Sequence, residues 1–376
     1  MGIMVGLPSP SGSEKDLQLN FGKNMTVQVE MRAPHLPAEW HTQSGIQLTW
    51  PHAGTDWNYI LDKVTACYLR LAYEIAVRER LLIVCPDPAE VERLLNEQLP
   101  KKATDNITYF ACPTNDTWAR DHAFLSVVDT DGVHLLDYRF NGWGGKFEAS
   151  LDNAINRRLY EQGAVKGLYT DRLDFELEGG SIESDGMGTL LTTTECLLNP
   201  NRNPQLDKTQ IELRLREDFG AEHILWLEHG ALAGDDTDSH IDTLARLCPQ
   251  DTILYVKCYR TEDEHYAELQ KMEEQLQTFR THEGKPFRLI ALPLPEAIHD
   301  EEGQRLPATY ANYLVMNRAV LYPTYAQPAL DEQARLAIEK AFPGYSVVGI
   351  DCRALIYQHG SLHCATMQYP KGVLTE

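Results

Sequence analysis

Five polar residues, far apart along the chain, have the types that nucleophilic catalysis uses: Asp121 in NDTWARDH, Glu178 in ELEGGS, His240 and Asp242 in SHID, and Cys364 in GSLHC. A cysteine joined by a histidine and carboxylates from distant segments is a candidate nucleophile. Each residue alone also has a structural explanation. Asp121 follows an arginine with which it could form an ion pair, and a lone His-x-Asp is more often structural than catalytic. The combination is therefore what indicates chemistry.

The sequence around Cys364 distinguishes it from the other seven cysteines. Gly360 and Ser361 precede it and permit a tight backbone, and the residues after it are unlike the middle of a core strand. If this segment is a strand, His363 points to the opposite face, so we do not assign it as the base. The chain has no C-x-x-C motif, and we expect most of the other cysteines to be reduced, buried and inert.

Alternating helix and hairpin signals predict the elements that carry these residues. Helical periodicity or capping signals predict helices over residues 57–77, 88–99, 152–163, 206–219, 263–281 and 330–341. Paired apolar runs predict strands or hairpins over residues 81–86, 106–112, 122–140, 181–194, 252–258, 313–323 and 353–368. Four or five modules of similar size, without a Gly/Ser linker between them, indicate one closed α/β structure of repeated units. In such a ring, equivalent strand ends meet near the axis.

Length and charge limit the classes of protein. Residues 1–24 are rich in Gly, Ser and Pro, and we expect a weakly ordered N-terminal extension before a single catalytic domain over residues 25–376. The 34 Lys and Arg against 55 Asp and Glu give a net charge of −21, which excludes an ordinary nucleic-acid binder and favours small cations. No run approaches the roughly 18 apolar residues of a membrane helix, and no basic leader opens the chain. We therefore expect a cytoplasmic protein without membrane partners.

Several longer motifs together resemble the agmatine deiminase and bacterial peptidylarginine deiminase family of guanidine-modifying enzymes. They are LPAEW from Leu36, TWPH, NDTWARD, NGWGGK, LEGG, TTTECLLNPNRNP, HID and LHCATMQYP. The resemblance covers nearly everything after Leu36, and the ordered set is specific in combination. It implies a closed five-bladed αβ propeller in a single domain, which agrees with the number of modules.

The resemblance also implies hydrolytic deimination, most simply of agmatine to N-carbamoylputrescine and ammonia in putrescine biosynthesis and polyamine metabolism. A guanidinium is a planar cation whose carbon is a poor electrophile, so it must be held and polarised. Asp121 and Asp242 are expected to clamp it while Cys364 attacks. His240 then protonates the departing ammonia and later activates water. Glu178 is expected to accept a hydrogen bond from His240, or else to cap the turn that follows it.

Trp118, Trp50 and Ser361 are the expected substrate-binding residues, although core burial explains either tryptophan nearly as well. The chain has no zinc-binding or P-loop motif, so we expect no metal and no cofactor. The expected partner is a small guanidinium compound, with a homo-oligomer such as a dimer left open. Alternative functions are deimination of peptidyl or free arginine to citrulline, amidine transfer to an amine, and a relative that has lost catalysis.

Overall fold

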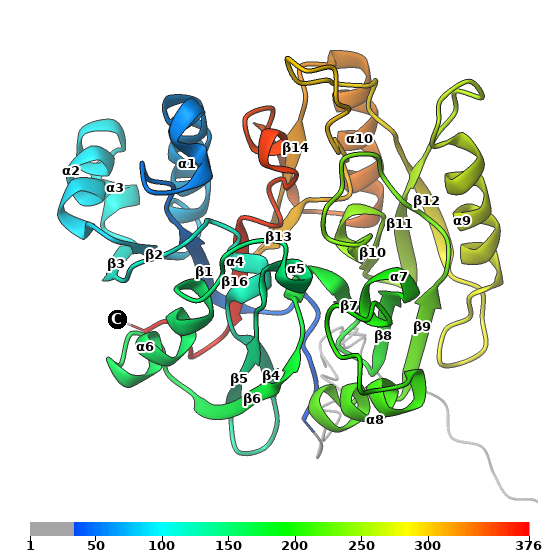
Figure 1. Ribbon diagram of the computed structural model, residues 1–376, viewed down its shortest axis with the longest axis horizontal. Helices are drawn as coiled ribbons and strands as arrows, with labels where there is room; N and C mark the ends of the chain where they lie inside the picture. Colours follow the sequence, from blue (N-terminus) through cyan, green and yellow to red (C-terminus); the bar gives the residue numbers. More distant parts are fainter. Residues whose placement is uncertain (1–33, 376) are drawn as a thin grey trace, which may run out of the picture. The chain divides into compact units, whose positions relative to one another are not determined.

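The strands lie in five small mixed sheets in the computed structural model, which describes residues 34–375 (Figure 1). In chain order they are β1 (Gln43–Thr49), β2 (Arg80–Cys85), β3 (Ile107–Ala111), β4 (Leu125–Val128), β5 (Val133–Arg139), β6 (Leu168–Glu176), β7 (Ile182–Ser184), β8 (Thr189–Thr193), β9 (His223–Leu227), β10 (Ala245–Cys248), β11 (Thr252–Lys257), β12 (Arg288–Pro293), β13 (Leu314–Met316), β14 (Ala319–Thr324), β15 (Ser346–Asp351) and β16 (Thr366–Pro370).

The helices are mostly placed between strands. They are α1 (Leu61–Ala76), α2 (Pro88–Gln98), α3 (Lys101–Thr104), α4 (Ala119–His122), α5 (Gly142–Gly145), α6 (Ile155–Glu161), α7 (Thr194–Leu197), α8 (Lys208–Phe219), α9 (Tyr266–Thr278) and α10 (Pro328–Ala341). Short 3-10 helices are η1 (Asp56–Ile60), η2 (Asp152–Ala154), η3 (Gly179–Ser181), η4 (Ile241–Thr243) and η5 (Leu355–Gln358). The six helices expected from the sequence are therefore present, with ends shifted by a few residues.

Local sequence explains where the helices begin and end. The Asp87 side chain accepts a hydrogen bond from the Glu90 amide at the start of α2, and proline stands in its first turn. A reciprocal capping box between Asp207 and Gln210 starts α8. This helix ends at Gly220, whose φ of 62° is the left-handed conformation that glycine adopts at low cost.

Each three-stranded sheet has one antiparallel and one parallel pair, and the four-stranded sheet has one antiparallel and two parallel pairs. The strand orders are β16-β1-β2-β3, β4-β5-β6, β7-β8-β9, β10-β11-β12 and β13-β14-β15. In the three-stranded sheets a hairpin comes first, and a helix then leads to the parallel strand, because parallel neighbours need a crossover. The first sheet is completed by β16 from the far end of the chain, which pairs antiparallel with β1.

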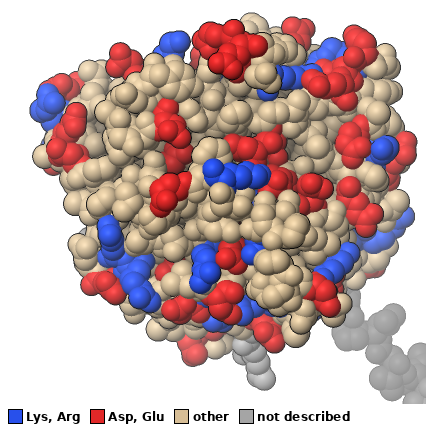
Figure 2. All heavy atoms as spheres, in the orientation of Figure 1, with Lys and Arg blue, Asp and Glu red and all other residues tan. Residues whose placement is uncertain are grey.

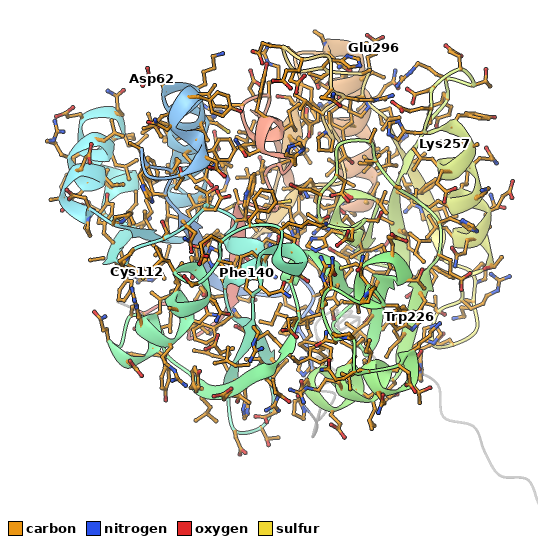
Figure 3. All side chains as sticks on the ribbon, in the orientation of Figure 1. Asp62, Cys112, Phe140, Trp226, Lys257 and Glu296 are labelled. Atoms are coloured by element: carbon orange, nitrogen blue, oxygen red, sulfur yellow. The ribbon has the colours of Figure 1, made fainter. Side chains whose placement is uncertain are left out.

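The expected closed five-bladed αβ propeller is wrong. Among the described residues the strands form five separate sheets, and none of these sheets closes on itself. Side chains fill the spaces between neighbouring ribbons, so packing rather than strand pairing joins the sheets (Figure 3). Hairpin and crossover patterns are local, and they do not specify whether the outer strands of successive units pair.

Two segments differ from the expected strands in a way that matters for the site. Residues 119–122 form the short helix α4, and strand β4 begins only at Leu125. The segment around Cys364 is a turn rather than part of a hairpin, and β16 begins at Thr366. Asp121 and Cys364 therefore lie on irregular backbone, where side chains are not restricted to alternate faces of a sheet.

The described residues, 34–375, belong to one compact unit. The expected extension over residues 1–24 lies outside the described residues, and so does the start of the single domain expected over 25–376, which stays a prediction. All eight cysteines are free and buried. None of the helices within residues 34–375 is both long and apolar enough to cross a membrane.

Candidate active site

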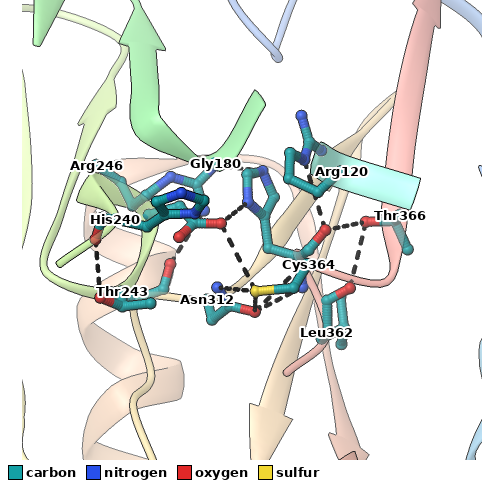
Figure 4. Close-up of polar contacts among 12 residues, drawn as sticks. Arg120, Gly180, His240, Thr243, Arg246, Asn312, Leu362, Cys364 and Thr366 are labelled. Atoms are coloured by element: carbon teal, nitrogen blue, oxygen red, sulfur yellow. Dashed lines mark hydrogen bonds and ion pairs between the residues drawn. The ribbon is translucent and has the colours of Figure 1, made fainter. Parts of the chain in front are cut away.

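Three of the expected catalytic side chains meet around Gly180 in η3. A methyl group added to Gly180 would lie 2.7 Å from His240 Nδ1, 2.9 Å from Asp121 Oδ1 and 3.0 Å from Asp242 Oδ2. The Gly180 amide donates a hydrogen bond of 3.0 Å to Asp121 Oδ1. The second glycine of the E-G-G motif therefore lets two carboxylates and an imidazole approach one another (Figure 4).

Asp121 is buried and contacts several polar neighbours. Its Oδ2 accepts a hydrogen bond of 3.0 Å from the Trp143 indole, and its Oδ1 lies 3.7 Å from His240 Nδ1. Burial raises the pKa of Asp121 to about 6; the positive charge of His240 opposes this shift, and the negative charge of Asp242 adds to it. The carboxylate is therefore ionised at neutral pH but loses its charge in mildly acidic solution.

The NGWGGK motif explains how Trp143 reaches Asp121. Trp143 has a φ of 56°, a left-handed conformation that is uncommon for a residue with a side chain, within a glycine-rich turn. A side chain at Gly144 would lie 2.2 Å from the Asn201 side chain, so only glycine fits there. The tight turn directs the indole N–H toward the buried carboxylate.

Cys364 is held against Asn312. The Asn312 amide nitrogen donates to Cys364 Sγ over 3.2 Å, and the Asn312 side-chain oxygen accepts from the Cys364 backbone amide, also over 3.2 Å. The thiol lies 3.9 Å from Asp242 Oδ2. Burial raises the pKa of Cys364 well above its usual value, and the charges of Asp242 and Asp121 raise it further. The thiol is therefore protonated until positive charge arrives beside it.

Asp242 is positioned by His363, the residue before Cys364. His363 Nδ1 lies 2.7 Å from Asp242 Oδ2. Burial raises the pKa of Asp242, but the hydrogen bond and the charge of His363, with contributions from other cations, outweigh it and the pKa is lowered. Sequence reasoning set His363 aside on the premise of a strand, and it missed this contact with Asp242, because the segment is a turn.

A buried ion network supports His363 from behind. His363 Nε2 contacts Glu39 Oε1 and lies 3.0 Å from Arg246 Nη2. Arg246 in turn pairs with Glu183 and Glu39. Burial raises the pKa of Glu39, but the charges of His363 and Arg246 outweigh it and lower that pKa. Glu39 belongs to the LPAEW motif, so the network gives that motif a structural role.

His240 is fully buried, and neither of its ring nitrogens has a hydrogen-bond partner among the described residues. Burial lowers its pKa, but the charge of Asp121, with contributions from Cys196 and Glu178, raises the pKa well above the usual value. The loop before it is strained, since Asp238 and Ser239 have φ angles of 65° and 61°. The imidazole is thus charged and available to a ligand.

Glu178 does not accept the expected hydrogen bond from His240, nor does its side chain cap η3. Both of its oxygens accept from Arg202 Nε, at 2.9 and 3.0 Å. Arg202 also contacts Asp238 at 2.6 Å and the Thr237 carbonyl at 2.9 Å. The arginine of the ECLLNPNRNP motif therefore ties Glu178 to the loop that carries His240, and Glu178 acts on His240 through its charge.

A cleft opens above this cluster and is lined by Trp118, Asp121 and Cys364. His240, Asp242 and Glu178 lie deeper and are not part of its lining. Trp118 packs against Trp57, with ring centroids 5.5 Å apart, and its ring would contact any side chain at position 360. In Figure 2, acidic side chains lie around the middle of the face that carries α4 and α5 in Figure 1.

Two further carboxylates, Asp116 and Asp236, line the same cleft. Burial raises the pKa of Asp116 to about 6, while hydrogen bonds from Thr117 and Trp57 oppose the shift. Burial also raises the pKa of Asp236 to about 6, although the charge of His359 lowers it. Sequence reasoning missed both residues, because an aspartate in a loop carries no signal of its own.

Two expected substrate-binding residues do not line the cleft. Trp50 is buried in the core and packs edge-on against Tyr68, with centroids 5.6 Å apart. Ser361 is buried, and its hydroxyl lies 3.1 Å from that of Tyr325. The neighbouring Gly360 lines the cleft, and Ser361, for which this position was expected, does not.

Two groups of side chains within the described residues could hold a metal ion: Glu178, Cys196 and His240, and Glu39, Glu183 and His363. The second group is already engaged in the ion network with Arg246. The first contains the unpartnered His240.

The chain belongs to the family of Porphyromonas-type peptidyl-arginine deiminases, whose family model matches residues 35–370. It is 33% identical over 353 residues to a candidate agmatine deiminase of Legionella pneumophila, covering 93% of this chain and 98% of that protein. A crystal structure of a candidate arginine deiminase from Porphyromonas gingivalis matches with 49% identity and a TM-score of 0.86, covering 91% of this chain and all of that one. A C. jejuni agmatine deiminase with substrate bound, a cysteine-to-serine variant, matches with 40% identity and a TM-score of 0.83, over 90% and 96% of the two chains.

Proposed function

We propose that this chain hydrolyses agmatine to N-carbamoylputrescine and ammonia through a covalent intermediate on Cys364. The family makes it an enzyme acting on a guanidino group, a carbon–nitrogen hydrolase. The observation that carries the proposal is the meeting of Asp121, Asp242 and His240 around Gly180, with the Cys364 thiol 3.9 Å from Asp242.

In the first half of the reaction, Asp121 and Asp242 bind the guanidinium N–H groups and keep its plane in place. The bound cation offsets the two negative charges that raise the pKa of Cys364, so the thiol loses its proton to the surrounding water more easily. The thiolate then attacks the guanidinium carbon. His240, as an imidazolium, gives its proton to the departing nitrogen, and ammonia leaves.

In the second half, a water molecule attacks the carbon that is now bonded to sulfur. Neutral His240 takes a proton from this water and so returns to its charged form. Collapse of the adduct breaks the carbon–sulfur bond, and the hydroxyl proton of the adduct passes to the departing sulfur, which leaves the urea group of the product and the Cys364 thiol. The sum is one agmatine and one water giving N-carbamoylputrescine and ammonia, which takes up the proton released by the thiol in the first half, with the enzyme unchanged.

Agmatine is the favoured substrate because it carries a second cation. Asp116 and Asp236, which line the cleft together with Trp118, provide negative charge for an ammonium group at the end of an aliphatic chain. The carboxylate of free arginine would be repelled there.

The test is ammonia release from agmatine, arginine and a blocked arginyl peptide, with Cys364→Ala as the inactive control. We expect kcat/KM to be at least about tenfold higher for agmatine, and Asp236→Asn to raise KM for agmatine with little change for the peptide. Faster turnover of the peptide would identify peptidyl arginine, and not agmatine, as the substrate. Full activity of Cys364→Ala would remove the covalent mechanism.

We also propose a cytoplasmic location and a small guanidinium compound as the partner, without nucleic acid or membrane. The net charge of −21 supports a cationic partner. Assembly into a homodimer remains a proposal, and gel filtration with light scattering tests it.

A further inference from the structure

A second thiol lies beside the catalytic imidazole. Cys196, at the end of α7, is buried together with Glu178 and His240. One ligand atom from each of the three residues lies within 4.8 Å of the other two. The mechanism proposed above gives Cys196 no step, although its position is next to the group that moves protons.

We propose that Glu178, Cys196 and His240 form an inhibitory binding site for a thiophilic divalent cation such as Zn2+. Thiolate, imidazole and carboxylate are the ligand types that zinc takes in proteins. The inhibitory consequence rests on the proposed role of His240 as acid and base, whereas metal binding itself does not.

The unpartnered nitrogens of His240 point to a ligand. The imidazole is fully buried, and neither nitrogen has a hydrogen-bond partner among the described residues. Buried polar groups are almost always paired, so this imidazole is free to act as a ligand. Glu178 also has capacity left, because each of its oxygens accepts a single bond from Arg202 Nε and has a further lone pair.

The geometry needs only a small adjustment. Zinc bonds of roughly 2.0–2.3 Å place neighbouring ligand atoms about 3–4 Å apart. The three atoms, now within 4.8 Å, would have to approach by about 1 Å. The surrounding carboxylates of Asp121 and Asp242 add negative charge. Water takes the fourth position, as in other open zinc sites.

Binding stops catalysis because the metal takes the lone pair that His240 needs. Coordination requires neutral imidazole and thiolate, so one proton leaves His240 and one leaves Cys196 for each Zn2+ bound. A metal-bound imidazole cannot protonate ammonia or accept a proton from water. The site therefore makes the enzyme sensitive to free zinc without any contact between the metal and Cys364.

The first experiment measures Zn2+ binding to the full chain by competition with a metal-sensitive dye. We expect one Zn2+ per chain for the wild type, for Cys364→Ala, and for Cys85→Ser, which alters another buried cysteine, in β2. Cys196→Ser should bind at least about tenfold more weakly. Loss of binding in Cys364→Ala, or unchanged binding in Cys196→Ser, would overturn the proposal.

The second experiment identifies the sulfur ligand with Co2+ as the probe. Cys364→Ala should show a thiolate-to-cobalt charge-transfer band, and the double variant Cys364→Ala/Cys196→Ser should lack it. If the double variant does not fold, as judged by its melting temperature, Cys364→Ala alone still tests the proposal. Absence of the charge-transfer band in Cys364→Ala would exclude every thiolate ligand other than Cys364 and would overturn the proposal.

The third experiment measures deiminase activity with added Zn2+. Wild type and Cys85→Ser should be inhibited, with recovery after a chelator is added, and Cys196→Ser should need at least about tenfold more metal for the same fractional inhibition. Inhibition that is the same in all three would contradict the assigned site. If agmatine is not a substrate, the two binding experiments still stand, so failure of the proposed function and failure of the metal site are distinguishable.

Discussion

At the residue scale, each reactive group is adjusted by one close neighbour. Asn312 holds the Cys364 thiol, Trp143 holds Asp121, and His363 holds Asp242. These neighbours are buried, so their contacts are not weakened by water. The reactivity of the site therefore depends on residues that do not contact the reacting carbon.

His363 is expected to act as a positioning residue for Asp242. Replacement by Ala removes a hydrogen bond to a charged group, worth about 1.5–3 kcal/mol, so kcat/KM for agmatine should fall by roughly 10- to 100-fold. The pKa of Asp242 should rise from its lowered value toward that of Asp121, so the acidic limb of the pH profile should become steeper as two carboxyls titrate in it. His363→Asn retains a donor and should recover part of the loss. An unchanged pH profile in His363→Ala would indicate a purely structural role.

The raised pKa of Asp121 predicts the pH dependence of substrate capture. The carboxyl is ionised above its pKa of about 6 and neutral below it. Only the ionised form attracts a guanidinium, so kcat/KM should fall as pH drops below about 6 and approach a tenfold loss per unit. Asp116→Asn and Asp236→Asn should each retain this limb, which separates Asp121 from the two other cleft carboxyls of similar pKa. A profile that stays flat down to pH 5 would contradict the assignment.

At the element scale, short irregular segments rather than long helices present the chemistry. α4 carries Asp121, η3 carries Gly180, η4 carries Asp242, and a turn before β16 carries Cys364. The sheets and long helices behind them provide a rigid frame, and loops on such frames commonly hold functional groups.

Gly180→Ala tests the close approach at η3. Its added methyl group would lie 2.7–3.0 Å from His240, Asp121 and Asp242, so one of the three must move. We expect kcat/KM to fall by at least about 100-fold, because a displacement of about 1 Å can cost that much. Gly180 has no positive φ, so the backbone itself tolerates alanine. Circular dichroism should therefore show a folded protein. Near-normal activity would mean that the three groups do not act together.

At the scale of the whole molecule, the net charge of −21 surrounds a cleft that contains further carboxylates. Such a field raises the local concentration of a cation and is screened by salt.

Raising the ionic strength from about 0.01 M to 0.15 M, which shortens the screening length from about 30 Å to 8 Å, should lower kcat/KM for agmatine several-fold. The value of kcat should change little, since the bound substrate is already in place. Stopped-time assays at constant pH measure both. An equal fall in kcat would point to an effect of salt on the chemistry instead.

Most secondary structure and the four main catalytic candidates could be predicted from the sequence, because these signals are local. Helical periodicity, the Asp-Gly hairpin and the capping residues specify elements without reference to the rest of the chain. The types of Cys364, His240, Asp121 and Asp242 and their motif context indicate guanidinium chemistry. Trp50 and Ser361 were chosen for the same kind of local reason, and they lie outside the cleft lining.

Only the tertiary structure decided the partners of these groups. It pairs Glu178 with Arg202 instead of His240, places His363 against Asp242, brings Cys196 beside His240, and puts Asp116 and Asp236 in the cleft. It also separates the strands into five sheets where a closed ring was expected. Hydrogen bonds and charge interactions act over a few ångströms in space, and that proximity arises from packing between segments separated by up to hundreds of residues.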